Sequence, residues 1–347
     1  SNASNPKYGI MQVDQLTPIE FDANLFNYGS QTQTNVQLQV EVRDASTGGL
    51  IQSLTSSTGC ASLLTGDTCT FNNLVTPNWT PANLPASYKI VYKLISDSIT
   101  SSSTSATDTF DFFVRDRLYS TDRNVISNFV GTNSANPPLQ QFGVQFNLQN
   151  EDPDRPGSGL NFLEGARVSF SAQTDSTADI EFAIYDASDF QLNSGFTGAP
   201  IQTFFYTLDG SAPGNPNYFF PFGTQDSIFD SSTQSWIDTL RPYELDTGNY
   251  YLTMTMFPNA VNGVVRVAND ASFPQPGNST IMQLNSGNWF TGFSSNTYEA
   301  PFMRLQMGAQ LPVVPTVNFS TSQNTVPESA GSVDVDLPIN PTSSTQD

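Results

Sequence analysis

The sequence predicts an all-β fold of tandem β-sandwich domains, and three observations lead to this prediction. Turn-favouring Asp, Asn, Ser, Thr, Gly and Pro are abundant, whereas only eight of the 32 acidic residues are Glu and only three of the 12 basic residues are Lys. Several segments alternate apolar and polar residues with the period of two that is typical of strands. No segment combines helix caps with apolar residues at a 3.6-residue period.

The first region, residues 4–118, is predicted to be one β-sandwich of about seven strands. Residues 18–25 and 36–43 alternate apolar and polar residues, so each strand should bury one face and expose the other. Residues 88–95 and 110–114 are two further strands of the set. The Ser/Thr-rich stretch between the last two is typical of a hairpin loop, because strand patterns resume directly after it.

Three short motifs of the first region occur together in a known domain class. They are Phe21-x-Ala-x-Leu-x-Asn27-x-Gly29, Thr34-Asn-Val-x-Leu-x-Val40-x-Val42 and Leu84-Pro-Ala-Ser-Tyr88. With them, residues 8–116 resemble the immunoglobulin-like CARDB domains of bacterial adhesion-related proteins. The resemblance implies an Ig-like β-sandwich with a role in adhesion.

The two cysteines, Cys60 and Cys69, lie in a short glycine-containing loop between strand-like segments. We predict a disulfide between them, because exported chains with an even number of cysteines usually pair them. The bond would close a ring of about ten residues and stabilise the fold by about 2–3 kcal/mol in the loop-entropy model. The alternative is two free thiols in a surface loop.

Residues 119–310 are predicted to form a second, larger β domain, after a polar boundary at 117–124. Its clearest strands are 142–148, 166–172, 180–185, 201–206, 250–257, 264–267 and 303–307. The runs Tyr243–Leu252, Val265–Asp270, Pro276–Ser279 and Ala300–Leu305, together with Trp289, resemble jelly-roll modules of secreted and outer-membrane proteins of Gram-negative gliding or marine bacteria. The resemblance implies export and a β-sandwich, and it carries over no catalytic residue.

Residues 311–347 combine a Pro-bounded linker, Leu311–Pro315, with what is predicted to be the incomplete start of a third β domain. Val317-x-Phe319 and Val326-Pro-Glu328 are similar to the start of a Calx-β domain, a family in which the Glu helps to bind calcium. The other ligands of that site would lie beyond Asp347. Because two strands alone are marginally stable, we expect the chain to be a piece of a longer modular protein.

Charge and composition argue against several functions. The formal net charge is −20, and an acidic surface repels phosphate backbones and anionic headgroups, so we expect no nucleic-acid binding and no direct membrane insertion. The chain contains no histidine, which excludes Ser-His-Asp and Cys-His catalysis and His-based zinc sites. Paired carboxylates could still hydrolyse glycosides, but nothing singles out one pair, so we expect no enzyme. Ser1-Asn2-Ala3 is typical of a cleaved expression tag and takes no part in these predictions.

Two sets of side chains are candidates for ligand binding. Calcium prefers carboxylate oxygens, and the densest acidic cluster is Glu151, Asp152 and Asp154. The alternative for this cluster is an ordinary proline-containing loop whose Asp side chains cap turns. Aromatic rings can stack on sugars, and the candidates are Trp79, Trp236 and Trp289, each of which could equally be packed in a core.

The sequence therefore favours a non-catalytic structural or adhesive module of an exported multidomain protein, secreted or at the outer cell surface. Its partner would be a polysaccharide or another surface protein. The alternative is a carbohydrate-binding module that accompanies a catalytic domain elsewhere in the full-length protein.

Overall fold

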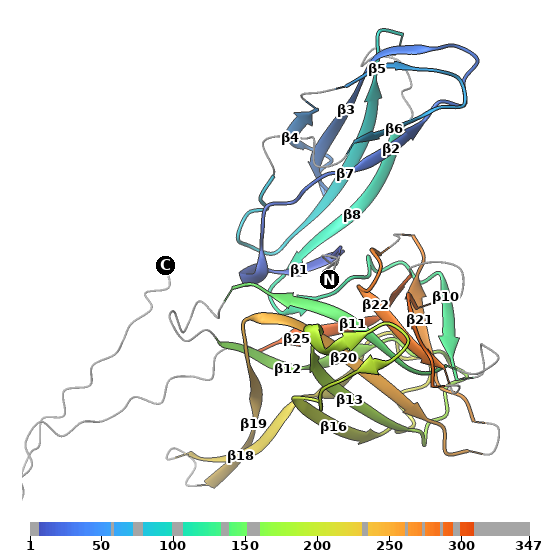
Figure 1. Ribbon diagram of the computed structural model, residues 1–347. Helices are drawn as coiled ribbons and strands as arrows, with labels where there is room; N and C mark the ends of the chain where they lie inside the picture. Colours follow the sequence, from blue (N-terminus) through green and yellow to red (C-terminus); the bar gives the residue numbers. More distant parts are fainter. Residues whose placement is uncertain are drawn as a thin grey trace, which may run out of the picture. The chain divides into compact units, whose positions relative to one another are not determined.

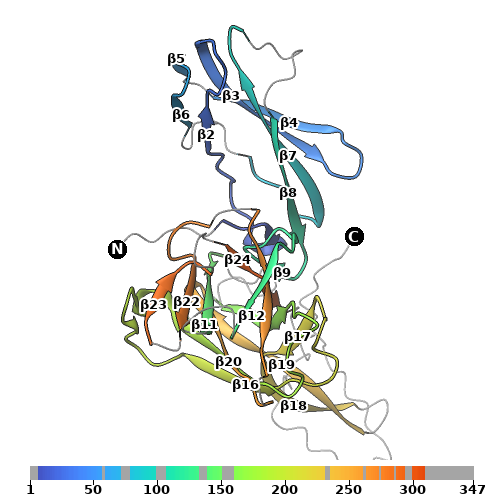
Figure 2. The ribbon, with the colours of Figure 1, turned by 90° about the vertical axis from the view of Figure 1, so that its right-hand side faces the viewer.

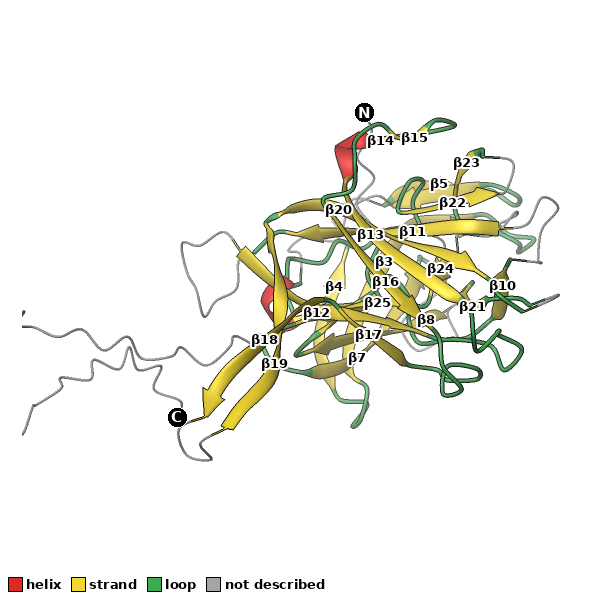
Figure 3. Cartoon of the chain, turned by 90° about the horizontal axis from the view of Figure 1, so that it is seen from below, coloured by secondary structure: helices red, strands yellow, loops and turns green. Residues whose placement is uncertain are grey.

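A computed structural model describes residues 7–56, 59–71, 79–98, 107–132, 139–150, 160–230, 235–260, 263–272, 275–284, 287–293 and 299–308, with only the backbone described for 107, 139, 160 and 224–241. These residues form strands, loops and two 3-10 turns, η1 (Val13–Gln15) and η2 (Ala187–Asp189), with no α-helix among them (Figure 3). They belong to one compact unit that ends at Gly308. The all-β fold class is confirmed.

Residues 10–115 form a first β-sandwich of two sheets (Figure 1). The larger sheet has the order β1-β8-β7-β3-β4, with β5 joined to β3, and the smaller sheet is β2-β6. The strands are β1 Ile10–Gln12, β2 Ala23–Phe26, β3 Gln33–Asp44, β4 Leu50–Thr55, β5 Cys60–Leu63, β6 Thr68–Phe71, β7 Ala86–Ile95 and β8 Thr107–Arg115. Strands β1 and β8 are parallel, whereas β7 is antiparallel to both β3 and β8.

The alternation in the sequence determines which face of β3 is buried. Val36, Leu38, Val40 and Val42 are all 0% exposed, and polar residues lie between them. The strands predicted at 36–43, 88–95 and 110–114 are confirmed as β3, β7 and β8.

The prediction that residues 18–25 form one strand is wrong in its first half. The strand β2 covers only Ala23–Phe26, and Ile19 makes a single bridge to Trp79. The physical reason is the topology: β1 belongs to the larger sheet and β2 to the smaller. The segment between them crosses from one sheet to the other, so it cannot stay in one ladder.

Residues 118–307 form a second sandwich, whose strands are arranged as in Figure 2. Its two large sheets have the orders β16-β13-β20-β11-β22-β23 and β18-β19-β12-β25-β9, with β17 joined to β12; a smaller sheet is β10-β21-β24, and β14 pairs with β15. The strands are β9 Leu118–Tyr119, β10 Asn128–Gly131, β11 Leu139–Leu148, β12 Leu160–Val168, β13 Asp179–Asp186, β14 Phe190–Gln191, β15 Gly195–Phe196, β16 Gln202–Thr207, β17 Tyr218–Pro221, β18 Gly223–Asp230, β19 Ser235–Asp246, β20 Gly248–Phe257, β21 Arg266–Asp270, β22 Thr280–Leu284, β23 Trp289–Thr291, β24 Ala300–Pro301 and β25 Met303–Met307.

Aromatic rings hold the two large sheets of the second sandwich together. Phe182 of β13 lies 4.8 Å from Phe220 of β17 and 5.4 Å from Phe222, measured between ring centroids. Phe204 of β16 stacks on Phe222 at 4.4 Å. Burying each such ring stabilises the fold by about 1.5–3 kcal/mol, so this cluster is a main source of cohesion.

The third β segment predicted at 311–347 lies outside the described residues and stays a prediction. The boundary between the first two domains was predicted at residue 118. In the structure β8 ends at Arg115 and β9 begins at Leu118.

Candidate binding cleft and the seam beside it

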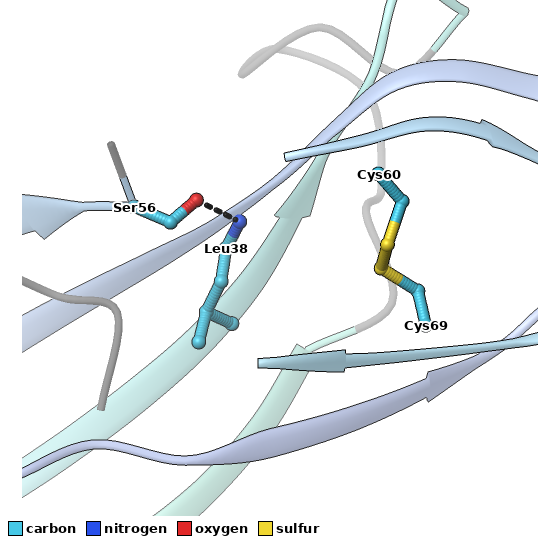
Figure 4. Close-up of a disulfide and its surroundings, with 4 residues drawn as sticks. All are labelled: Leu38, Ser56, Cys60 and Cys69. Carbon is cyan, nitrogen blue, oxygen red and sulfur yellow. Dashed lines mark hydrogen bonds between the residues drawn. A yellow bond between two sulfur atoms is a disulfide. The ribbon is translucent and has the colours of Figure 1, made fainter. Parts of the chain in front are cut away.

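The predicted disulfide between Cys60 and Cys69 is present (Figure 4). Their Cα atoms are 6.3 Å apart. Cys60 lies on β5, which pairs with β3 of the larger sheet, and Cys69 lies on β6, which pairs with β2 of the smaller sheet. The bond therefore links the two sheets of the first sandwich. Figure 4 also shows Ser56, whose Oγ accepts a hydrogen bond from the backbone N–H of Leu38 at 3.1 Å.

A polar seam joins the two sandwiches; we define it as residues 7–15 and 116–124 with the side chains that bond to them. The backbone N–H groups of Gly9 and Ile10 donate to the carbonyl oxygen of Ser120 at 3.0 and 3.1 Å. A Cβ at Gly9 would lie 2.3 Å from the carbonyl oxygen of Asp122, so only glycine fits this close approach.

Gln15 of η1, which is 2% exposed, uses its whole amide within the seam. Its Nε2 donates to Asn161 Oδ1 at 2.9 Å and to the carbonyl of Asn150 at 2.8 Å. Its Oε1 accepts from the backbone N–H groups of Gln149 and Asn150 at 2.9 and 3.2 Å. A buried amide satisfied in this way fixes the loop after β11 of the second sandwich against the first.

Two tyrosines add an apolar contact to the seam. Tyr8 stacks on Tyr119 of β9 with ring centroids 4.2 Å apart. The hydroxyl of Tyr8 accepts from the backbone N–H of Asn147, and the hydroxyl of Tyr119 donates to the carbonyl of the same residue at 3.0 Å. Burial raises the pKa of both phenols, so both remain protonated at neutral pH.

The second half of the seam is held by a buried ion pair. Asp122 is 0% exposed and Arg304 of β25 is 9% exposed. The guanidinium donates from Nε to Oδ2 at 2.9 Å and from Nη2 to Oδ1 at 2.6 Å, a bidentate geometry. Asp122 Oδ1 also accepts the backbone N–H of Asn124 at 2.9 Å, and Ser120 Oγ donates to Oδ2.

A cleft of about 610 Å³ lies beside the seam and is lined mainly by the first sandwich, with Arg123, Val125 and Ser272 of the second. Its two sides are residues 22–25, which include the start of β2, and residues 108–111 of β8. The apolar side chains that reach it include Leu38, Tyr92 and Leu94. Lys89, Lys93 and Arg123 bring positive charge to it. A second cleft of about 580 Å³ shares Asp22, Tyr92 and Phe110 with the first.

Arg123 is held at the cleft by a ring contact and a hydrogen bond. The guanidinium of Arg123 lies 4.8 Å from the centroid of the Phe110 ring and donates to the carbonyl of Ser272 at 2.9 Å. Burial lowers the pKa of Arg123, and nearby carboxylates partly offset this. Burial also raises the pKa of Tyr92, and the charge of Asp22 adds to the effect.

The candidate tryptophans whose side chains are described lie in cores. Trp79 and Trp289 are each 5% exposed. Trp79 packs edge-on against Tyr88 with centroids 4.8 Å apart. Trp289 packs edge-on against Phe190 and Phe196 at 5.7 and 5.4 Å. Their burial favours the core interpretation over sugar stacking, and the side chain of Trp236 lies outside the described residues.

A different aromatic side chain is exposed on the second sandwich. Phe205 of β16 is 71% exposed. It begins a cross-strand row on the outer face of the sheet β16-β13-β20-β11-β22-β23. The strand registers place in that row Phe205, Glu181, Thr255, Gln141, Gln283 and Trp289. Glu181 lies directly opposite Phe205 in the strand register, so a carboxyl group stands beside the exposed ring. Burial raises the pKa of this carboxyl group.

The calcium candidates Glu151, Asp152 and Asp154 lie outside the described residues, so calcium binding stays a prediction. Within the described ranges, no group of three or more His, Cys, Asp or Glu side chains is placed to hold a metal ion. No helix in the part of the chain that the structure describes is long and apolar enough to cross a membrane.

Comparisons with known proteins give no match: no family model, no curated protein and no solved structure matches this chain. The strand pairing and the disulfide define the chain as an all-β sandwich protein whose one disulfide links two sheets.

Proposed function

We propose that this chain is a rigid, non-catalytic structural or adhesive module of an exported multidomain surface protein, secreted or held at the outer cell surface. The observation that carries the proposal is the seam. Only Asp116 and Arg117 separate β8 from β9, and both are bonded. The carbonyl of Asp116 accepts from Gln12 Nε2 at 2.9 Å, and that of Arg117 accepts from the backbone N–H of Met307 at 2.7 Å.

Domains in one chain move relative to each other unless their interface restrains them. Here the restraint comes from a very short linker and the buried amide of Gln15. The Asp122–Arg304 pair lies within the second sandwich and holds in place the stretch whose Ser120 carbonyl accepts from Gly9 and Ile10. Such a joint would keep neighbouring domains at a fixed spacing, which is what a display or adhesion module requires.

Two further observations support the remaining parts of the proposal. The order β8-β7-β3 in one sheet and the separate pair β2-β6 correspond to the G-F-C and B-E neighbours of an immunoglobulin-like sandwich. The two large sheets of the second sandwich fit a jelly-roll-like domain. The disulfide supports an oxidising compartment and hence export.

The proposal is tested by measuring the distance between the two sandwiches in solution. Spin labels are attached through ketone-bearing unnatural amino acids at Ser53 of β4 and Thr207 of β16, both exposed, and the distance distribution is recorded by pulsed electron resonance. A single narrow distribution is expected, and Asp122→Asn should broaden it. A broad distribution in the unaltered chain would reject the rigid module.

The second candidate is a carbohydrate-binding module, and the exposed ring of Phe205 on the second sandwich favours it. Phe205 offers a ring face, and the partly exposed carboxyl group of Glu181 opposite it can bond sugar hydroxyls. Native affinity electrophoresis in gels containing marine and plant polysaccharides tests this candidate. Retardation on one polymer that is lost in Phe205→Ala, but kept in Tyr28→Ala on the first sandwich, would support it. Mobility that is unchanged on every polymer would reject it.

A further inference from the structure

Part of one edge of β8 has no strand partner among the described residues. The backbone N–H of Phe113 donates to the carbonyl of Gly9 at 3.0 Å, so the backbone of Phe113 faces away from β7 and toward β1. Backbone direction repeats every two residues along a strand, so the N–H and C=O groups of Asp111 and Thr109 face the same way. Strand β1 pairs only with residues 113–115. The edge at Thr109 and Asp111 therefore faces the cleft, which these residues line.

The strand β2 also has an edge whose backbone groups pair with no described strand. The N–H of Asn27 donates to the carbonyl of Asp67 just beyond β6, so Asn27 faces the β6 side. By the same two-residue period, the backbone of Asn24 faces away from β6. No described strand pairs with that side of β2, and Asn24 lines the cleft.

Two strand edges from different sheets thus border one cleft with apolar side chains between them. Leu94 and the rings of Tyr92 and Phe110 line it, and the buried Leu38 lies next to it. A backbone edge that offers N–H and C=O groups beside apolar pockets is the arrangement that accepts an extended peptide as an added strand. A sugar would use the side-chain groups but not this ladder.

We propose that the cleft between β2 and β8 binds an extended segment of a partner protein as an added β-strand, in which apolar residues alternate with basic ones. The edge of β8 from Thr107 to Asp111 is about 16 Å long, which fits about five residues of an added strand. Alternate side chains of that segment would enter the cleft, and the others would face solvent.

Charge complementarity selects the basic partner. The carboxylates in and beside the cleft are Asp22, Asp108, Asp111, Glu41 and Asp270. The cations are Lys89, Lys93 and Arg123, of which Lys93 pairs with Glu41. The carboxylates therefore outnumber the cations, and the whole chain carries a net charge of −20. The excess carboxylates repel one another and attract cations. Lysine or arginine on the solvent face of the added strand would therefore be favoured.

The test uses the full chain and fluorescent nonapeptides. The first peptide has the core Val-Lys-Val-Lys-Val, and the second carries Val-Asp-Val-Asp-Leu, which is this chain's own segment 333–337. A third peptide is the basic one with N-methylated backbone nitrogens, which cannot donate ladder hydrogen bonds. Binding is followed by fluorescence anisotropy at low and moderate salt.

Two variants of Thr109 isolate the backbone edge. Thr109→Pro removes the cleft-facing N–H. In the structure this N–H donates to the carboxylate of Asp108 at 2.8 Å and not to β7. Proline is tolerated at a strand edge, so the variant should fold. Thr109→Val keeps the N–H and changes only the side chain. We expect Thr109→Pro to weaken binding of the basic peptide about tenfold and Thr109→Val to leave it unchanged. Asn24→Pro on β2 serves if Thr109→Pro fails to fold.

Binding of the basic peptide alone, lost on N-methylation and weakened in Thr109→Pro, supports the proposal. It is overturned if no peptide binds, if the N-methylated peptide binds equally well, or if the acidic peptide binds as tightly as the basic one, since the occupant would then be a segment of this chain. These variants leave every seam residue unchanged, so loss of peptide binding in them would not count against the proposed rigid module.

Discussion

Replacing Asp122 by Asn should destabilise the protein more than any surface charge substitution. The change preserves the volume of the side chain, so it creates no cavity. It removes the negative charge that receives two hydrogen bonds from Arg304, which also donates to Asn124 Oδ1 at 2.8 Å. The guanidinium is then left nearly buried without a counter-charge.

The expected size follows from the burial of both partners. Removing one member of a buried ion pair costs about 3–5 kcal/mol, because the other charge stays desolvated. For a domain of this size each kcal/mol lowers the melting temperature by about 2–4 °C, so a decrease of about 6–20 °C is expected. The exposed pair of Arg117 and Glu164, with side-chain exposures of 49% and 21%, is the matched control. Arg117→Met should cost about 0–1 kcal/mol.

The assay is thermal unfolding followed by circular dichroism, for Asp122→Asn, Arg117→Met and the double variant Asp122→Leu/Arg304→Met. The double variant replaces both charges by apolar side chains and should recover a large part of the loss. If Asp122→Asn and Arg117→Met lower the melting temperature equally, the buried pair does not anchor the seam and the reasoning is refuted.

Three further predictions concern the disulfide, a close backbone approach and an acid-sensitive turn. Replacing both Cys60 and Cys69 by Ala should lower the free energy of unfolding by about 2–3 kcal/mol in urea titrations, and an unchanged midpoint would contradict the loop-entropy estimate. Gly9→Ala places a Cβ 2.3 Å from a backbone oxygen of the seam and should cost about 1–3 kcal/mol, whereas Gly210→Ala, with open space around it, should be nearly neutral by calorimetry. Backbone N–H groups lower the pKa of Asp175 to about 2, so its stabilisation is complete above its ordinary pKa of about 4 and is lost as the pH falls toward 2; Asp175→Asn should flatten the pH dependence of the melting temperature in that window, and identical profiles would count against the assignment.

The sequence predicts strands well where one face is buried and the other is wet. Residues 36–43 alternate because β3 covers the core on one side only. The hairpin of β18 (Gly223–Asp230) and β19 (Ser235–Asp246) was not predicted, because neither segment alternates. Residues 18–25 do alternate, yet the pattern cannot show that the chain changes sheets partway through.

The sites could not be predicted because they depend on which residues are brought together. The polar stretch 117–124 was interpreted as a domain boundary, and it contains Asp122, which is fully buried. A sequence does not distinguish a polar residue in water from one that bonds to Arg304, far along the chain. To predict the cleft, one would have to know which strand edges stay unpaired. On β8 this depends on how far β1 pairs along it, which the sequence does not show. The disulfide was predictable because exported chains with an even number of cysteines usually pair them, and this chain has two.

The parallel pairing of β1 with β8 has a consequence for the order of folding. During synthesis β1 emerges well before its partner Phe113, which lies in the last strand of the first sandwich. Loop closure over such a sequence separation is slow compared with the formation of local hairpins. Ile10 and Met11, both buried in the finished protein, must therefore remain exposed while the rest of the sandwich forms. Because Gly9 and Ile10 also bond to Ser120, the amino-terminal segment locks into place only after the second sandwich has begun to emerge.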